Sequence, residues 1–163
     1  MPDFPKIEPS PMDPLELVQK KLREADFFLD RLRASAPTGE EADFNLSAFL
    51  SAAKAAANRL KGFEKFEKTR PERERQLWNL MTSERNWDVH RVTPDTKRIE
   101  QGEQAVTVGG HAVATDGIPV VIPPCLCFVW EGKNVPAVKL CSEFAATLRR
   151  MINDYCAQEQ AGR

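Results

Sequence analysis

The chain has 163 residues, which is typical of one domain, and its 42% hydrophobic residues are enough to form a core. A net charge of -1 provides no general attraction to nucleic acid or acidic membranes, so any nucleic-acid contact requires a local basic patch. The sequence has neither an apolar run of about 18 residues, as a membrane span needs, nor a secretory signal pattern, and we therefore expect a cytoplasmic protein without a membrane partner.

Residues 1–12 are rich in proline and predict an extended, flexible arm. A single helical domain is expected over residues 13–160. Its first helix, over 13–35, begins at Asp13 and Pro14, which are typical of an N-cap and a first helical turn. Apolar residues then recur every three or four positions and predict one buried face, made of Leu15, Val18, Leu22, Ala25, Leu29 and Leu32.

Three further helices are expected. The second covers 43–66, and its small residues, as in "SAAKAAANRL", would allow a neighbouring helix to pack closely. The third covers 71–90, between Pro71 and Pro94. The last covers 141–158. Together the four segments predict a mainly α fold, a four-helix-type bundle.

The composition changes over residues 104–140, which are rich in valine and isoleucine and interrupted by glycine and proline. This pattern is typical of two to four short strands joined by turns. We expect all the strands of the protein to lie in this segment, as a small β-rich insertion before the last helix.

The cysteines favour a structural interpretation over a metal site. Their spacing does not repeat a Cys-x-x-Cys pair, so a zinc site would require long-range assembly, and reduced, mostly buried thiols are the simpler expectation for Cys125, Cys127, Cys141 and Cys156. Only two histidines are present, which argues against a multi-histidine metal centre, and His111 is expected in a turn or at a strand edge. Neither a metal nor another cofactor is predicted.

The segment "ERNWDVH" brings together the residues that carry most chemistry, Arg85, Asn86 and His90. Arginine presents a planar fork of donors that matches phosphate oxygens, and histidine can move a proton near neutral pH. On a continuous helix, however, residues five apart differ by about 140° around the axis, so Arg85 and His90 would share no face. They can act together only if the helix ends or kinks, or if two chains meet. The alternative is an ordinary charged helix end.

The order Arg85-Asn86-Trp87-Asp88-Val89-His90 resembles the Arg-polar-x-x-x-His motif of HEPN domains (higher eukaryote and prokaryote nucleotide-binding). "FNLSAFLSAAKAAANRL" is also similar to the second helix of many bacterial members, which often carry arginine where this chain has Lys54. The resemblance covers roughly residues 13–91 and, more loosely, the final helix.

The resemblance implies a helical bundle that dimerises and a metal-independent ribonuclease acting through Arg85, Asn86 and His90 at the dimer cleft. It further implies a toxin or defence role and a nucleotidyltransferase-type antitoxin as partner. Weaker RNA contacts are predicted for a basic and aromatic set comprising Lys54, Arg73, Arg75, Trp87 and Arg91.

Two alternatives stay open at the level of sequence. One is a non-catalytic module of the same fold that binds a nucleotide or a protein. The other is a helical interaction protein that uses its alanine-rich second helix as an interface. The intact Arg-Asn-x-x-x-His motif favours the ribonuclease, whereas the weak basic balance favours the alternatives.

Overall fold

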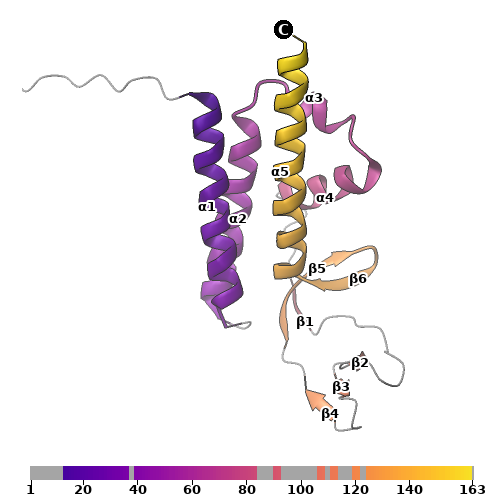
Figure 1. The fold of residues 1–163 in the computed structure, drawn as a ribbon. Helices are drawn as coiled ribbons and strands as arrows, with labels where there is room; N and C mark the ends of the chain where they lie inside the picture. The colour runs from indigo at the N-terminus through magenta and orange to yellow at the C-terminus, as the bar shows by residue number, and fades with distance from the viewer. Residues whose placement is uncertain are drawn as a thin grey trace, which may run out of the picture.

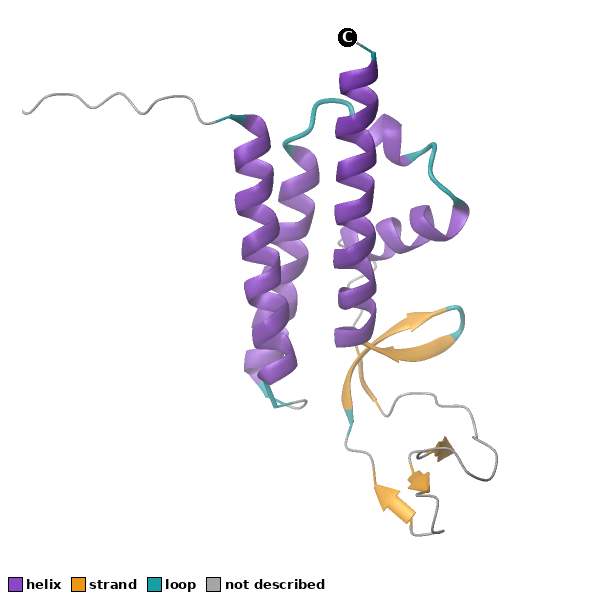
Figure 2. Ribbon diagram, viewed as in Figure 1, coloured by secondary structure: helices purple, strands orange, loops and turns teal. Residues whose placement is uncertain are grey.

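The computed structural model of the chain is mainly helical, with small antiparallel sheets before the last helix (Figures 1 and 2). It describes residues 13–36, 39–83, 90–92, 106–108, 111–113, 119–121 and 124–162. Between residues 90 and 121 it describes the strands' backbone. The elements in chain order are α1 (Pro14–Ala34), α2 (Glu40–Asn58), α3 (Phe63–Glu67), α4 (Glu72–Thr82), β1 (His90–Val92), β2 (Val106–Val108), β3 (His111–Val113), β4 (Pro119–Val121), β5 (Cys125–Trp130), β6 (Lys133–Pro136) and α5 (Ala137–Ala161).

Helix α1 confirms the predicted start. The Asp13 carboxylate accepts a hydrogen bond from the Leu15 backbone N–H at 3.1 Å, and Pro14 occupies the first helical position. The predicted apolar face is buried from Val18 onward. Leu15 is the exception, because it is 41% exposed at the first turn of the helix.

The predicted second helix is not continuous. It begins earlier, at Glu40, ends at Asn58, and is followed by the separate short helix α3. The break contains Gly62, whose φ of 87° lies in the left-handed region that glycine adopts without steric cost. A single helix over 43–66 was therefore a wrong prediction, and the overlooked signal was this glycine.

The predicted third helix also ends too late. Helix α4 stops at Thr82, and the chain is in a β-strand by His90. The buried residues of α4, Leu77 and Met81, lie in its final turns, so the apolar stripe ends where the helix does. The backbone at His90 forms a sheet ladder instead, and strand β1 also lies outside the predicted strand region 104–140.

Three long helices form the core. Helices α1, α2 and α5 lie side by side (Figure 1), and each contacts the other two. The rings of Phe49 on α2 and Phe144 on α5 meet edge to face with centroids 6.4 Å apart, and both are fully buried. Helix α5 is longer than predicted, since it begins at Ala137 and extends to Ala161.

Strand β5 is the middle strand of the sheet β1-β5-β6, and all its pairings are antiparallel. Leu126, Cys127 and Phe128 on this strand are buried, so the β5–β6 hairpin contributes side chains to the core. The hairpin runs directly into α5 at Pro136 and Ala137, and Figure 2 shows it at the start of that helix. The other sheet has the order β2-β3-β4.

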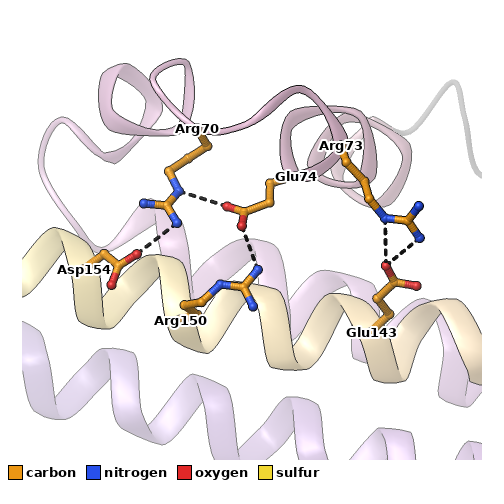
Figure 3. A network of polar contacts seen from close by, with 6 residues as sticks. All are labelled: Arg70, Arg73, Glu74, Glu143, Arg150 and Asp154. Atoms are coloured by element: carbon orange, nitrogen blue, oxygen red, sulfur yellow. Dashed lines mark hydrogen bonds and ion pairs between the residues drawn. The ribbon is translucent and has the colours of Figure 1, made fainter.

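An ion-pair network fastens α4 to α5 (Figure 3). Glu74 on α4 accepts from Arg70 Nε at 2.9 Å and from Arg150 Nη2 on α5 at 2.7 Å. Arg70 also reaches Asp154 on α5 at 2.9 Å. The Glu74 side chain is only 14% exposed. Burial alone would raise the pKa of Glu74, but the hydrogen bonds and charges of Arg70 and Arg150 outweigh it and hold that pKa below its ordinary value.

Glu74→Gln should lower the free energy of unfolding by about 1–2 kcal/mol at pH 7, since it removes a charge that two arginines share. A carboxyl whose folded-state pKa is depressed stabilises the fold above its ordinary pKa, 4.5, and loses that contribution as the pH falls through the lowered folded-state value. The difference in the free energy of unfolding between wild type and variant should therefore disappear at acidic pH. Urea unfolding across pH measures it, with the exposed Glu64→Gln as a control that should change little. An equal gap at pH 3 and pH 7 would contradict this account.

No helix in the described ranges has the length and apolarity to cross a membrane.

Candidate functional site

The motif segment lies between two anchored elements. On one side α4 ends with the Ser83 backbone N–H donating to the Asn79 carbonyl at 3.1 Å. On the other side the backbone of His90 begins β1. Arg85, Asn86 and Trp87 fall outside the described residues, so these three predicted site residues have no assigned geometry. Both Arg85 and His90 nevertheless lie after the last residue of α4.

Strand β1 is held by the β5–β6 hairpin. His90 lies opposite Cys127 in the ladder, Arg91 opposite Leu126, and Val92 opposite Cys125. Cys127 also lies opposite Pro136, the residue before α5. The backbone at His90 is thus two strands away from the start of α5, on an edge strand whose neighbour is part of the core.

Two arginines predicted to contact RNA have carboxylate partners. Arg73 Nη2 is 3.0 Å from Glu143 Oε1 on α5, and Arg73 Nη1 is 3.7 Å from Glu131 Oε1 in the β5–β6 turn. The Glu143 pair appears in Figure 3. Arg75 is paired with Glu72 one turn earlier in α4. An RNA phosphate would have to replace these carboxylates, which makes the face of α4 a weaker candidate than the motif segment.

Arg73 also links the two elements that flank the motif segment. Its two ion pairs connect the first turn of α4 to α5 and to the turn between β5 and β6. Strand β1 pairs with β5 of the same hairpin. The helix that precedes the motif and the sheet that follows it are therefore joined by an ion pair as well as by the core. The Arg73 side chain is 61% exposed, so its ion pairs contribute the modest energy that is typical of a surface pair.

The remaining candidate residues lie within helices and strands. Lys54 is half-buried on α2. The ring of Trp78 lies 5.6 Å from that of Phe63 and 6.0 Å from that of Phe144, in an aromatic cluster. Trp130 is also half-buried and packs against the core. His111 is the first residue of β3, which is the middle strand of the sheet β2-β3-β4.

Burial raises the pKa of two titratable side chains. Burial raises the pKa of the Cys141 thiol on α5, which keeps it protonated. Burial also raises the pKa of Glu67 on α3, against the opposing charges of Lys68 and Arg75. Within the part of the chain that the structure describes, no three histidine, cysteine, aspartate or glutamate side chains lie close enough together to hold a metal ion.

Sequence reasoning missed two clusters. The first is the set of ion pairs that joins Arg73 and Glu74 on α4 to Glu143 and Arg150 on α5, 70 and 76 residues away. No sequence signal locates such a pair. The thiols of Cys125 and Cys127 lie 3.7 Å apart, and their spacing did offer a signal, because alternate residues of a strand share a face.

No protein-family model, curated protein or solved structure matches the chain. The fold alone defines a mainly helical protein with a small antiparallel sheet before its last helix.

Proposed function

We propose that the protein is a metal-independent endoribonuclease of the HEPN type, with Arg85, Asn86 and His90 as its catalytic residues. The observation that carries the proposal is the end of α4 at Thr82. A helix continuing to residue 90 would have separated Arg85 from His90 by about 140° around its axis. Because the helix ends before both residues, that obstacle is absent.

The anchoring of the segment gives further support. Its beginning follows a helix that is fastened to α5 by Glu74 and Arg150, and its end is a strand paired with β5. Catalytic groups need a rigid scaffold, since small displacements of the reacting groups cost large factors in rate. The helix before the segment and the strand after it are both held to the rest of the fold and can supply that scaffold.

The chemistry requires no metal ion. The ribose 2′-hydroxyl of the RNA attacks the adjacent phosphorus, a bond forms between the 2′-oxygen and phosphorus, and the bond from phosphorus to the 5′-oxygen breaks. His90 transfers the proton that the 2′-oxygen loses or the 5′-oxygen gains. Arg85 binds the phosphate and offsets the charge that builds on it in the transition state. Asn86 positions His90 or the phosphate.

The test is incubation of purified protein with single-stranded RNA, and with DNA of the same sequence, in the presence of EDTA. The expected result is cleavage of the RNA alone, because DNA lacks the nucleophile. If varied RNAs stay intact after removal of any bound partner, the ribonuclease assignment is wrong. The non-catalytic binding module of the same fold would then replace it.

Arg85→Lys should lower the cleavage rate by about 100-fold or more, since a compact ammonium does not replace a planar, two-pronged donor. The charge is unchanged, so a purely electrostatic attraction to RNA would survive. Single-turnover cleavage at saturating protein measures the effect. Arg23→Lys on the exposed face of α1 is the matched control and should cleave as wild type does. Equal rates for Arg85→Lys and wild type would remove Arg85 from the proposed site.

The proposal includes a homodimer in which two copies of the motif share a cleft. Phe44 is the position at which we test an interface on α2, because its ring is 70% exposed on that helix and a second copy of the chain could bury it. We expect Phe44→Glu to convert the dimer to a monomer at micromolar concentration, measured by light scattering. Gln158→Glu, on the exposed last turn of α5, is the control and should stay dimeric. A monomeric wild type would contradict both the dimer and the shared cleft.

A further inference from the structure

Two cysteine thiols meet on strand β5. The Sγ atoms of Cys125 and Cys127 are 3.7 Å apart, which is van der Waals contact between two sulfur atoms that are not bonded. All four cysteines are present as thiols. Cys127 is fully buried, whereas Cys125 is half-buried and reaches the surface. The pair thus combines a half-buried cysteine with a buried one whose sulfur is 3.7 Å away.

Cys125 lines a small cavity. About 110 Å³ of space lies between the end of α1, the start of α2, β5 and the start of α5, and Cys125 lines it together with Arg33, Ser35 and Ala137. One water molecule needs only about 10–15 Å³ of such space, so the cavity can hold more than one small molecule. A small oxidant such as hydrogen peroxide therefore fits in the cavity that Cys125 lines.

The cavity also borders an arginine side chain and the N-terminus of α5. The Arg33 side chain lines it and is kept in place by Asp30 at 2.7 Å and by the Ser142 hydroxyl at 2.9 Å. Helix α5 begins at the same cavity with no acidic residue in its first turn and no side-chain cap, so the positive end of its dipole is not neutralised there. Cysteines that react with peroxides are characteristically accessible to solvent and often lie next to a second, resolving cysteine, as Cys125 does.

We propose that Cys125 and Cys127 form an oxidative modification site, at which a peroxide converts the two thiols into a disulfide within β5. The Cys125 sulfur attacks the peroxide, the O–O bond breaks, and a sulfenic acid and water form. The Cys127 sulfur then attacks the sulfenic sulfur, the S–O bond breaks, and a second water leaves with the thiol proton. Two thiols and one peroxide thus give one disulfide and two waters, and two electrons pass from sulfur to oxygen.

This disulfide would be strained and therefore reversible. Alternate residues of an extended strand are about 6.4–6.8 Å apart at Cα, whereas disulfides favour about 5.5–6 Å. Closing the bond must shorten β5 locally. Strained disulfides are more easily reduced than relaxed ones, and they are the type found in regulation rather than in structural bracing.

The strain acts next to the proposed catalytic histidine. Cys127 lies opposite His90 and Cys125 lies opposite Val92, so both ladder positions of β1 would be displaced when β5 shortens. A misplacement of about 1 Å can cost up to about 100-fold in rate. We therefore expect oxidation to slow RNA cleavage by up to that factor and reduction to restore it; this part of the inference rests on the proposed ribonuclease function.

Mass spectrometry tests the modification independently of any activity. Residues 99–132 contain neither lysine nor arginine, so trypsin releases a 99–133 peptide that carries Cys125 and Cys127 and no other cysteine. After hydrogen peroxide and alkylation of the remaining thiols, this peptide should be lighter than its reduced form by two hydrogen atoms. Dithiothreitol should restore two alkylatable thiols. Oxygen addition without disulfide formation, or an unreacted peptide, would overturn the proposal.

Three variants complete the test. Cys125→Ser and Cys127→Ser should each abolish the mass change, whereas Cys156→Ser, which removes the other half-buried thiol, should leave it intact. In the RNA assay, peroxide should slow wild type and Cys156→Ser but not Cys125→Ser. A wild type that forms the disulfide and cleaves at an unchanged rate would refute the coupling to His90. If wild type never cleaves RNA, the mass change still decides the modification, and only the ribonuclease function fails.

Discussion

Replacing His90 with alanine should lower the rate of RNA cleavage by about 100- to 10,000-fold, the usual contribution of a general acid or base. The loss should appear in the chemical step, since Arg85 still binds the phosphate. The fold should survive, because residue 90 lies on an edge strand of three residues, where side-chain preferences are worth about 1 kcal/mol or less. Single-turnover cleavage together with circular dichroism separates the two effects.

His111→Ala is the matched control for this experiment. The chain has only two histidines, so the control makes the same chemical change on strand β3 and leaves the motif intact. It should cleave at the wild-type rate. If His90→Ala cleaves as fast as wild type does, the activity belongs to other residues or to a contaminant. If both variants lose activity, His90 has no special role.

Phe144→Ala should lower the free energy of unfolding by about 3–5 kcal/mol, the range for truncating a large aromatic residue in a packed core. Phe144 is fully buried on α5 and contacts the rings of Phe49 on α2 and Trp78 on α4. The variant therefore opens a cavity where three helices meet. Urea denaturation monitored by tryptophan fluorescence measures the loss, and the same cavity should make Trp78 more sensitive to solvent.

Phe27→Ala provides the comparison for Phe144, since it deletes the same ring where that ring is 55% exposed on α1. The expected cost is below about 1 kcal/mol, because a surface position forms no cavity. Both variants are measured at one protein concentration, so that any self-association affects them equally. Similar losses for the two would mean that the core is not organised around Phe144.

The helices with a sustained apolar period were predictable from sequence. Helix α1 follows from its Asp13–Pro14 start and its three- and four-residue spacing, and α5 follows from a similar stripe. The break between α2 and α3 could also have been predicted, since Gly62 stands at the one position there with a positive φ. It was missed because the apolar residues Leu60 and Phe63 seemed to continue the helical pattern.

The end of α4 and the start of β1 depend on contacts that sequence periodicity does not report. The three residues of β1 are too few to give a strand pattern, and their partner β5 lies more than 30 residues further on. The pairing of α4 with α5 is also long-range in sequence, since Glu74 and Arg150 are 76 residues apart. The residue types of the candidate site could be read from the sequence, but their anchoring came from these long-range pairings.

The nature of the nucleophile is the most direct test of the central claim. Cleavage sites on a single-stranded RNA are first mapped in EDTA, and the same RNA is then made with one 2′-deoxyribose at the main site. The account predicts that this single change blocks cleavage there and nowhere else, and that products of the unmodified RNA end in a 2′,3′-cyclic phosphate. Cleavage at the deoxyribose position, or a requirement for added metal ions, would contradict the assignment of Arg85 and His90 to metal-independent RNA cleavage.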